Sequence, residues 1–403
     1  MTRRFICLWL CSFAITAATH ADWLGFRGPA ATGISAETNL PVSWSEDKNV
    51  AWKIDLPGRG LSSPIIVGDS VIVTCCSGPD QDSLHVLCLD ADGGKTLWQR
   101  RIWSTGRTMC HPKTNMAAPT PVSDGKYIYA LFATCDLIGL DLDGNVRWMR
   151  SLSLDYPGIG NNVGLAASPA VAAKTLVALI DNDGTSFAIG IDTATGTTRW
   201  QVPRERTVNW TSPVIWSDNQ GQNPVVLLQG STGLIAHDLA TGAQRWSLAE
   251  KCETIPSVTT SGGTMVVPAD GLIALRPDPQ TDSPNILWRS KQLRPATASP
   301  LVLDDRVYTV NSAGVVSCAN MSDGERVWQL RLKGPFSASP VAAGGRLYYV
   351  NEAGVCQVVE PGEAGKLVGT NAFGEMILAS PAVAGGALYF RSDAHLWKIS
   401  QDG

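Results

Sequence analysis

The chain has 403 residues, of which 44% are hydrophobic and 17% charged, a composition that excludes a disordered chain. Its formal net charge is −4 at pH 7, without the basic excess of nucleic-acid-binding proteins, so we expect no nucleic acid partner. The 39 Gly, 24 Pro and 14 Trp residues favour many short strands joined by tight turns, which is typical of an all-β fold.

Residues 1–21 have the three-part pattern of a secretory signal peptide. Arg3 and Arg4 precede an apolar run over residues 5–18. Small residues, Thr19 and Ala21, then stand three residues and one residue before a cleavage point at Asp22. A buried N-terminal helix is the alternative interpretation. The apolar run is too short for a comfortable membrane span, and no other stretch reaches the necessary length, so the protein is not expected to span a membrane.

The location of the protein follows from this signal. A lipid-anchored protein needs Cys directly after the cleavage point, whereas Cys7 and Cys11 lie inside the apolar run. We therefore expect an exported, soluble protein of the periplasm or cell envelope. Residues 22–48 form a Gly/Pro-rich N-terminal extension, and we expect its aromatic residues to pack on the wall of the domain that follows; they are Trp23, Phe26 and Trp44.

Two sequence markers repeat along residues 49–403 with a similar period of about 40 to 50 residues. A small residue followed by Pro recurs at eight positions, and a Trp recurs in step with it. The Pro markers are Ser63-Pro64, Thr120-Pro121, Ser168-Pro169, Ser212-Pro213, Ile255-Pro256, Ser299-Pro300, Ser339-Pro340 and Ser380-Pro381, and the Trp markers are Trp98, Trp148, Trp200, Trp246, Trp288 and Trp328.

Each repeat reads as a four-stranded antiparallel meander. In the sixth repeat, short apolar or alternating stretches are separated by turns at Asp304-Asp305, Ala313-Gly314 and Ser322-Asp323-Gly324. One such sheet cannot bury both of its faces, but a ring of sheets can, which predicts a β-propeller. The seventh repeat is the weakest, with Val368 in place of the Trp.

The last repeat lacks its fourth strand. Residues 49–56 have the form of that strand and lie on period before Trp98, so we expect them to pair with residues 394–400 and close the ring. The predicted fold is thus an eight-bladed β-propeller closed by the N-terminal strand, with seven blades and an additional hairpin as the alternative.

The turn-and-Trp units resemble the PQQ-type tryptophan repeat. They include residues 89–98, 191–200 and 237–246. The mature chain resembles the exported bacterial PQQ-like repeat (BamB-like) propellers over residues 49–403. The resemblance implies the fold, but one fold carries both enzymes and scaffolds. We expect the repeat Trp side chains to cover the neighbouring blade rather than to contact a cofactor.

Loops that lead into first strands and loops that join second to third strands share one face of a propeller. The longest link between blades lies over residues 107–115, and long loops in compact domains are often functional. We expect a protein or a small ligand to bind this funnel face, whereas a solvated rim is the alternative. The candidate residues are Arg107, His111, Lys113, Asn115, Asn161, Asn162, Trp210, Glu253, Arg294 and Glu352.

Eight Cys follow the signal, and the exported location favours disulfides. Cys75, Cys76, Cys110 and Cys135 are expected near one face of two adjacent blades, with Cys75 and Cys76 ending one second strand and Cys135 ending the next. At least one disulfide or close thiol pair is predicted among them. A zinc site at Cys110, His111 and Cys135 is disfavoured, because no C-x-x-C pair supports it, and no metal is expected.

The sequence supports an exported, non-catalytic propeller that acts as a binding or scaffold module in the cell envelope, as a monomer and without a cofactor. No G-x-S-x-G, H-E-x-x-H or P-loop motif is present. The alternative is a quinoprotein dehydrogenase that uses PQQ and Ca²⁺ to oxidise alcohols or sugars. In some of these enzymes a vicinal disulfide lies against the quinone, which drew attention to Cys75-Cys76. A BamB-like role in outer-membrane protein assembly is a third hypothesis.

Overall fold

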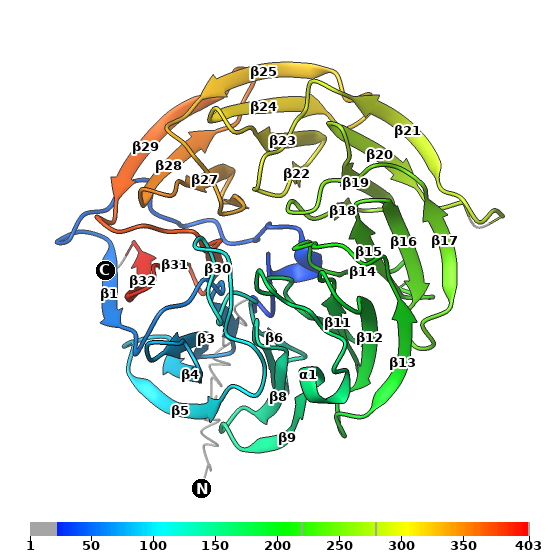
Figure 1. Ribbon diagram of the computed structural model, residues 1–403. Coiled ribbons are helices and arrows are strands. Elements are labelled where there is room, and N and C mark those ends of the chain that lie inside the picture. Colours follow the sequence, from blue (N-terminus) through cyan, green and yellow to red (C-terminus); the bar gives the residue numbers. More distant parts are fainter. Residues whose placement is uncertain (1–21, 219–220, 279, 402–403) are drawn as a thin grey trace, which may run out of the picture.

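The computed structural model describes residues 22–218, 221–278 and 280–401 (Figure 1). The predicted signal peptide lies outside these residues. Eight four-stranded antiparallel sheets are arranged as the blades of a ring, which confirms the predicted propeller. We call the face that carries the loops into first strands the upper face, and the opposite face the lower face.

The strands follow chain order from the channel outward in blades 1 to 7. Blades 1 to 4 consist of β2 (Ile65–Val67), β3 (Ser70–Ser77), β4 (Ser83–Asp90), β5 (Thr96–Trp103); β6 (Val122–Ser123), β7 (Tyr127–Leu131), β8 (Asp136–Asp141), β9 (Val146–Ser151); β10 (Ala170–Ala172), β11 (Thr175–Ile180), β12 (Phe187–Asp192), β13 (Thr198–Pro203); and β14 (Val214–Trp216), β15 (Val225–Gly230), β16 (Gly233–Asp238), β17 (Gln244–Leu248).

The second half of the ring has the same plan. Blades 5 to 8 consist of β18 (Thr259–Ser261), β19 (Thr264–Pro268), β20 (Leu272–Arg276), β21 (Asn285–Ser290); β22 (Leu301–Leu303), β23 (Arg306–Val310), β24 (Val315–Asn320), β25 (Arg326–Arg331); β26 (Val341–Ala343), β27 (Arg346–Val350), β28 (Val355–Glu360), β29 (Lys366–Ala372); and β30 (Ala382–Ala384), β31 (Ala387–Arg391), β32 (His395–Ser400), β1 (Val50–Asp55). A short helix α1 (Leu152–Asp155) follows β9, and a 3-10 helix η1 (Pro29–Ala31) precedes the ring.

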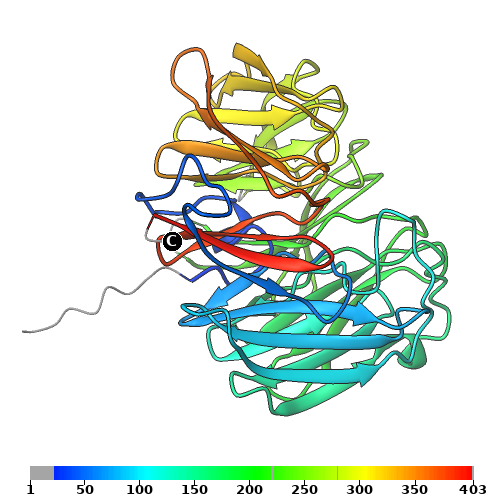
Figure 2. The same cartoon turned by 90° about the vertical axis from the view of Figure 1, so that its left-hand side faces the viewer.

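The ring closes as predicted. β1 pairs with β32 in antiparallel register, with Trp52 opposite Lys398 and Asp55 opposite His395. The two strands lie side by side in Figure 2, where blue meets red. Closure by the N-terminal strand therefore joins the two ends of the ring within one sheet.

A chain of hydroxyl groups links the blades around the channel and explains the residue before each Pro. The backbone N–H of Ser63 donates to the Thr120 hydroxyl of the next blade at 2.9 Å, and the N–H of Thr120 donates to the Ser168 hydroxyl at 3.0 Å. The same bond recurs around the ring. Its further members are Ser168 to Ser212, Ser212 to Ser257, Ser257 to Ser299, Ser299 to Ser339 and Ser339 to Ser380.

The fifth marker of the sequence prediction was misplaced by this criterion. Ile255-Pro256 was taken as the equivalent dipeptide, but Ser257 supplies the hydroxyl that accepts the bond from Ser212. Ile255 is 42% exposed. The position requires a hydroxyl beside the next blade rather than a following Pro, because the buried N–H needs an acceptor.

The repeat Trp residues join the outer parts of neighbouring blades, as expected. The Trp98 indole N–H donates to the carbonyl oxygen of Leu142 in blade 2 at 2.8 Å, and Trp52 closes the ring with a bond to Ala91 at 3.1 Å. The Trp98 ring lies against Gly144, whose φ is +78°, and a Cβ there would come within 2.5 Å of it. This turn needs Gly for its backbone conformation and for the close approach.

Residues 22–48, here called the lower segment, cross the lower face. The Trp23 N–H donates to the Ile66 carbonyl oxygen at 2.9 Å in blade 1, and the Ala342 N–H donates to the Gly33 carbonyl oxygen at 2.8 Å in blade 7. Between them, η1 lies in the middle of the ring (Figure 1). The segment therefore spans the mouth of the channel. Trp44 packs against Phe373 and Phe390 of blades 7 and 8, in keeping with the expectation that the aromatic residues pack on the propeller, whereas Phe26 lines a cavity beside the channel.

Candidate functional site

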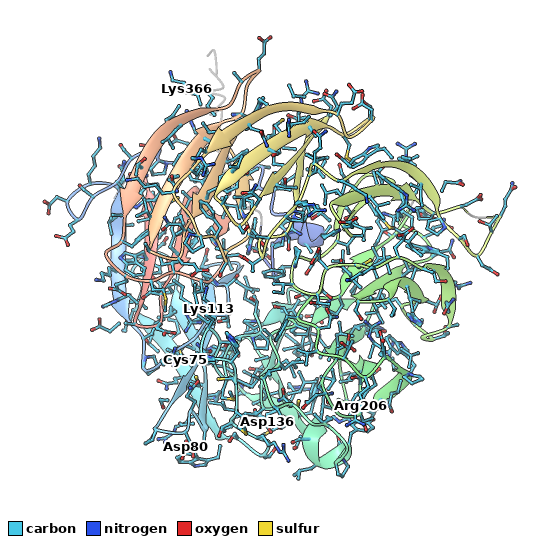
Figure 3. All side chains as sticks on the ribbon, turned by 45° about the horizontal axis from the view of Figure 1, so that its top comes forward. Cys75, Asp80, Lys113, Asp136, Arg206 and Lys366 are labelled. Carbon is cyan, nitrogen blue, oxygen red and sulfur yellow. The ribbon has the colours of Figure 1, made fainter. Side chains whose placement is uncertain are left out.

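Residues 104–121, here called the crossing loop, run over the upper face from blade 1 towards the middle of the ring and on to blades 7 and 8. The His111 N–H donates to the Val163 carbonyl oxygen at 2.9 Å, and the Lys113 ammonium binds the Glu352 carboxylate at 2.9 Å. Figure 3 shows Lys113 towards the inner part of the ring, and Figure 2 shows the loop opposite the lower segment.

Four of the predicted site residues meet through the crossing loop. Arg107 donates to the side-chain oxygen of Asn162 at 2.8 Å, and Lys113 reaches Glu352 although 239 residues separate them in sequence. The Lys113 side chain is 62% exposed and that of Glu352 is 16% exposed. Arg107, His111 and Lys113 face solvent, so they present two permanent cations and an imidazole on a chain that is acidic overall.

Two other predicted residues, Asn115 and Asn161, are buried and hold the loops themselves. The Asn115 side-chain oxygen accepts from the Ala117 N–H at 3.0 Å, and the Asn161 amide donates to the carbonyl oxygen of Ala133. Asn161 has φ +47°, a conformation that Asn tolerates better than most residues. These side chains shape the upper face and do not present polar groups to a ligand.

Glu253 and Arg294 lie apart from the crossing loop, on the side of blades 5 and 6. Together with Asp270 they line a cavity of about 320 Å³. Arg294 binds the Asp270 carboxylate at 2.8 Å, and Lys291 binds it at 3.1 Å. The hydrogen bond from Lys291 to Asp270 is the largest cause that holds the pKa of Asp270 below its usual range, and the charge of Arg294 adds to it.

Trp210 links two blades of the upper face. Its indole N–H donates to the Gly164 carbonyl oxygen at 3.2 Å, and its backbone N–H donates to Thr254 at 2.8 Å. Cys110 lies against the same Gly164, where an added Cβ would meet its side chain at 2.8 Å. Trp210 thus supports the segment to which the crossing loop is attached.

The sequence analysis missed a buried polar network next to Trp210. The Asp181 carboxylate and the Arg204 guanidinium form a buried ion pair at 2.8 Å, and the Asn209 amide donates to Asp181 at 2.9 Å. Gln229 donates from its amide to the Glu253 carbonyl oxygen at 2.6 Å. A groove of about 690 Å³ begins at Asp181 and Arg204 and runs between blades 3 and 4. Asp181 directly follows β11, but the sequence analysis did not single it out.

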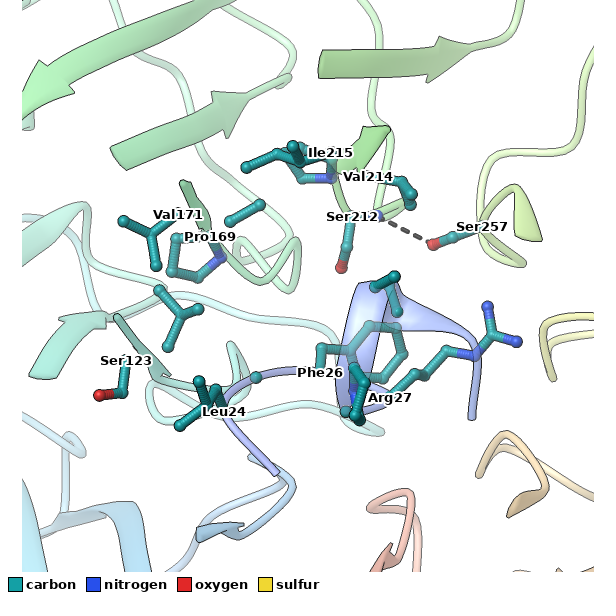
Figure 4. Close-up of a pocket in the computed structure, with 18 of the residues that line it drawn as sticks. Leu24, Phe26, Arg27, Ser123, Pro169, Val171, Ser212, Val214, Ile215 and Ser257 are labelled. Atoms are coloured by element: carbon teal, nitrogen blue, oxygen red, sulfur yellow. Dashed lines mark hydrogen bonds between the residues drawn. The ribbon is translucent and has the colours of Figure 1, made fainter. Parts of the chain in front are cut away.

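The lower segment enters the channel from the other side (Figure 1). Arg27 is 1% exposed and donates to the Thr259 hydroxyl at 2.9 Å and to the Pro300 carbonyl oxygen at 2.5 Å. No carboxylate of the described residues forms a salt bridge with it, and burial lowers the pKa of its guanidinium to about 9. Beside it, a mainly apolar cavity of about 250 Å³ remains, lined by Leu24, Phe26 and Val171 among others (Figure 4).

The structure holds all eight cysteines after residue 21 as free thiols, so the disulfide remains a prediction. Cys75 and Cys76 follow each other in β3 and point to opposite faces of blade 1, one into the core shared with blade 8 and the other into the core shared with blade 2. Cys135 lies in the turn after β7, not at its end, and has φ +67°. Burial raises the pKa of Cys76 to about 11 and that of Cys135 to about 12.

These positions do not fit a PQQ site that relies on a vicinal disulfide. The Cys75 thiol accepts a bond from Arg391 at 3.3 Å, whereas the Cys76 thiol bonds the Arg59 carbonyl oxygen at 3.4 Å on the other face. An extended strand keeps adjacent side chains apart, so this pair cannot form a disulfide without a rearrangement of β3. Within residues 22–218, 221–278 and 280–401, no group of three or more His, Cys, Asp or Glu residues is arranged to hold a metal ion.

No helix in the described part of the chain is long and apolar enough to cross a membrane. The chain of hydroxyl groups, the Trp-to-turn bonds and the strand closure define the class of the protein, an eight-bladed propeller of PQQ-like repeats. A family model described as "Outer membrane protein assembly factor BamB" matches residues 30–187 and 275–364. These ranges cover more than half of the chain, which therefore belongs to this family.

Two curated relatives carry the same description. The protein of Moranella endobia is 28% identical over 178 residues, which are 43% of this chain and 41% of the relative. That of Alkalilimnicola ehrlichii is 27% identical over 159 residues, 39% of this chain and 36% of the relative. The matched part of the chain thus spans about two fifths of the length of these relatives.

Solved structures of different activity share the fold. BamB from Moraxella catarrhalis has a TM-score of 0.64 at 17% identity, covering 87% of this chain and 97% of its own. A europium-containing methanol dehydrogenase has a TM-score of 0.68 at 13% identity, and the match covers 93% of this chain and 90% of the dehydrogenase. A quinohemoprotein alcohol dehydrogenase from Comamonas testosteroni has a TM-score of 0.69 at 12% identity, and the match covers 95% of this chain and 81% of the dehydrogenase. Likeness at these identities shows the fold alone.

Proposed function

We propose that this chain is an exported, non-catalytic propeller that binds protein partners in the cell envelope as an outer-membrane assembly factor. In this proposal residues 1–21 are the export signal, residues 22–48 an extension and residues 49–403 the binding domain, which works as a soluble monomer without a cofactor. The observation that carries it is the crossing loop, which is fixed at both sides of the ring yet leaves Arg107, His111 and Lys113 exposed. The family match supports the assembly role.

A fixed but exposed loop is suited to recognition. Because its anchoring bonds are already made, little conformational entropy is lost when a partner binds. The two cations favour a partner with an acidic surface and accelerate its encounter, an effect that weakens as salt rises. Glu352 reduces this positive field near Lys113. The cation that contributes most is therefore Arg107, whose side chain forms hydrogen bonds, among the described residues, with the neutral groups of Asn162 and Gly160.

The test replaces the three exposed side chains together, as Arg107→Ala, His111→Ala and Lys113→Ala. Binding is measured to purified components of the outer-membrane β-barrel assembly machinery at two salt concentrations. We expect the triple variant to bind at least tenfold more weakly and to lose most of the salt dependence. A matched control replaces three exposed lysines elsewhere, Lys95, Lys126 and Lys366, with Ala. Equal binding by the triple variant and the unaltered protein would contradict the proposed surface.

The quinoprotein alternative has a direct test of its own. PQQ and Ca²⁺ are added to the purified protein, and dye-linked oxidation of alcohols and sugars is measured. We expect no oxidation above that of PQQ with Ca²⁺ alone, because Cys75 and Cys76 lie on opposite faces of β3. Oxidation that depends on the protein would overturn the non-catalytic proposal whatever the result of the binding experiment.

A further inference from the structure

Three exposed apolar side chains and two arginines lie on the upper side of the molecule, on the rim of blades 1 and 2 and on the part of the crossing loop that leaves it. Trp103 at the end of β5 is 60% exposed, Met109 on the crossing loop is 57% exposed, and Leu154 in α1 is 67% exposed. Arg101 precedes Trp103 by two residues in the sequence, and Arg107 precedes Met109 by two. We call these five residues the rim surface, and Figure 1 shows the end of β5 and α1 on the same side of the ring.

Hydrogen bonds fix the two parts of the rim surface against each other. The Thr105 N–H donates to the Asp136 carboxylate at 3.0 Å, and the Thr105 hydroxyl donates to the same carboxylate at 2.5 Å. The Ser151 hydroxyl lies 2.5 Å from the Thr105 hydroxyl oxygen and donates to it. Ser151 is also the N-cap of α1 and accepts from the Leu154 N–H at 3.3 Å. The segment after Trp103 is therefore tied to the helix that presents Leu154, so these side chains belong to one rigid part of the surface.

Exposed apolar side chains are concentrated in this part of the chain. Among the described residues, thirteen large hydrophobic side chains are exposed, and seven of them lie within residues 97–154. The other six are spread over residues 255–376. Leu97, Leu142 and Val146 lie at the lower ends of β5, β8 and β9, whereas Trp103, Met109 and Leu154 lie on the upper side. Isolated exposed apolar residues are ordinary, but three on the same side of one part of the ring mark a surface that a partner can cover.

The charge of the same region is opposite to that of the whole chain. Residues 95–155 contain eight Lys and Arg against five Asp and no Glu, whereas the formal net charge of the chain is −4. Arg101 lies over the Trp103 ring at 4.6 Å and donates to the Ser83 hydroxyl at 2.6 Å. Neither Arg101 nor Arg107 forms a salt bridge with a carboxylate of the described residues, so both cations are available to an anionic partner.

We propose that the rim surface docks the protein onto an anionic lipid bilayer. Trp is the side chain most typical of the membrane interface, and neighbouring cations attract acidic headgroups. The apolar side chains project from a strand end, a loop and a single-turn helix, an arrangement that inserts between headgroups without exposing a long backbone edge to the lipid. This surface is distinct from the proposed protein-binding residues except for Arg107, which the experiment leaves unchanged.

The experiment measures sedimentation of the purified protein with vesicles of equal parts phosphatidylglycerol and phosphatidylcholine, and with vesicles of phosphatidylcholine alone. We expect binding only to the acidic vesicles, and weaker binding at high salt. Arg101→Gln should weaken binding about fivefold, the effect of losing one cation near an acidic surface. Trp103→Ala should weaken it by about tenfold, through loss of inserted apolar area.

A matched control tests whether the location matters. Leu287→Ala with Arg289→Gln removes one apolar side chain and one cation from β21 of blade 5, where Leu287 is 43% exposed. We expect this variant to bind like the unaltered protein. Brominated acyl chains should quench the fluorescence of the unaltered protein more than that of Trp103→Phe, which identifies the inserted ring.

Two outcomes would overturn the proposal. One is the absence of sedimentation with acidic vesicles, and the other is equal sedimentation of the unaltered protein and Trp103→Ala. If Trp103→Ala instead abolishes a complex with an envelope protein while vesicles are never bound, the rim surface belongs to a protein partner. Failure here leaves the triple-variant experiment on Arg107, His111 and Lys113 untouched, so the two proposals fail separately.

Discussion

Two segments outside the blades cover the two mouths of the same channel, and they are held in different ways. The lower segment buries Trp23, Leu40 and Trp44 and places Arg27 in the channel. The crossing loop also buries part of its length, but Arg107, His111 and Lys113 remain exposed, and one of its two long-range contacts is an exposed ion pair, Lys113 with Glu352.

The difference separates a segment of the fold from a candidate binding surface. Apolar burial stabilises in proportion to the area removed from water and is insensitive to salt, whereas an exposed ion pair contributes little and is screened. The lower segment should therefore behave as part of the propeller core. The crossing loop should tolerate changes to its exposed side chains, so that those residues are free to serve recognition.

The largest effect is expected when the closing strand is removed with the lower segment. A truncation that starts at residue 57 leaves β32 without β1 and opens two sheet edges, which invite aggregation. We expect no soluble monomer with a cooperative melting transition. Thermal melting and gel filtration measure this outcome.

A second truncation, starting at residue 49, separates the two contributions. It keeps β1 and removes only the lower segment, so we expect a closed monomer with a lower melting temperature. If the truncation starting at residue 57 remained a monomer with an unchanged melting temperature, closure by β1 would not stabilise the ring, and the comparison between the two segments would lose its basis.

The next effect compares two tryptophans. Trp23 is 1% exposed and lies against Gly28, where an added Cβ would come within 2.4 Å of its ring. We expect Trp23→Ala to lower the free energy of unfolding by about 3–5 kcal/mol, because it leaves a large cavity. Trp103→Ala, at a position 60% exposed, should change it by less than about 0.5 kcal/mol. Denaturant unfolding of both variants measures the difference, and equal losses would contradict it.

Much of the fold could be predicted because it depends on local patterns that repeat. The eight Pro markers, the Trp markers in step with them and the form of residues 49–56 were sufficient to predict eight blades and ring closure. The fifth Pro marker was wrong because a dipeptide pattern does not reveal which residue supplies the hydroxyl, here Ser257. Arg27 was missed because a buried cation contradicts the usual distribution of charged residues.

The candidate site could be predicted only in part for a related reason. Spacing indicates which loops share a face, and the crossing loop was found in this way. It does not indicate how far a loop reaches, so the pairing of Lys113 with Glu352 across 239 residues was out of reach. The burial of Asn115 could not be predicted either, because a polar side chain in a loop is expected to be exposed unless its hydrogen bonds are known.

A third prediction compares two arginines, one from each segment. Arg27→Lys keeps the charge, but an ammonium cannot reach Thr259, Pro300 and Thr32 together as the planar guanidinium does. We expect the free energy of unfolding to fall by about 1–3 kcal/mol, the cost of buried acceptors left without a donor. The matched variant Arg107→Lys should change it by less than about 0.5 kcal/mol. If both variants lost a similar amount of the free energy of unfolding, the crossing loop would be as much a part of the core as the lower segment.

The smallest effect on stability concerns the anchor of the crossing loop, and it is the most informative about function. In Lys113→Met the alkyl part of the side chain is kept and the ion pair with Glu352 is lost. The Lys113 side chain is 62% exposed, so water screens the pair and the free energy of unfolding should change by less than about 0.5 kcal/mol. Amide hydrogen exchange within residues 104–121 should nevertheless become faster, because the contact of the loop with blade 7 is gone, while the bonds of His111 and Asn115 remain. Raising the salt concentration should have the same effect on the unaltered protein and little effect on the variant.

Exchange in the lower segment should not change in either case, since burial holds it. If exchange in the crossing loop were equal in both proteins at low salt, its position would be set by its buried part alone, and Lys113 would be free to bind a partner at no cost to the loop.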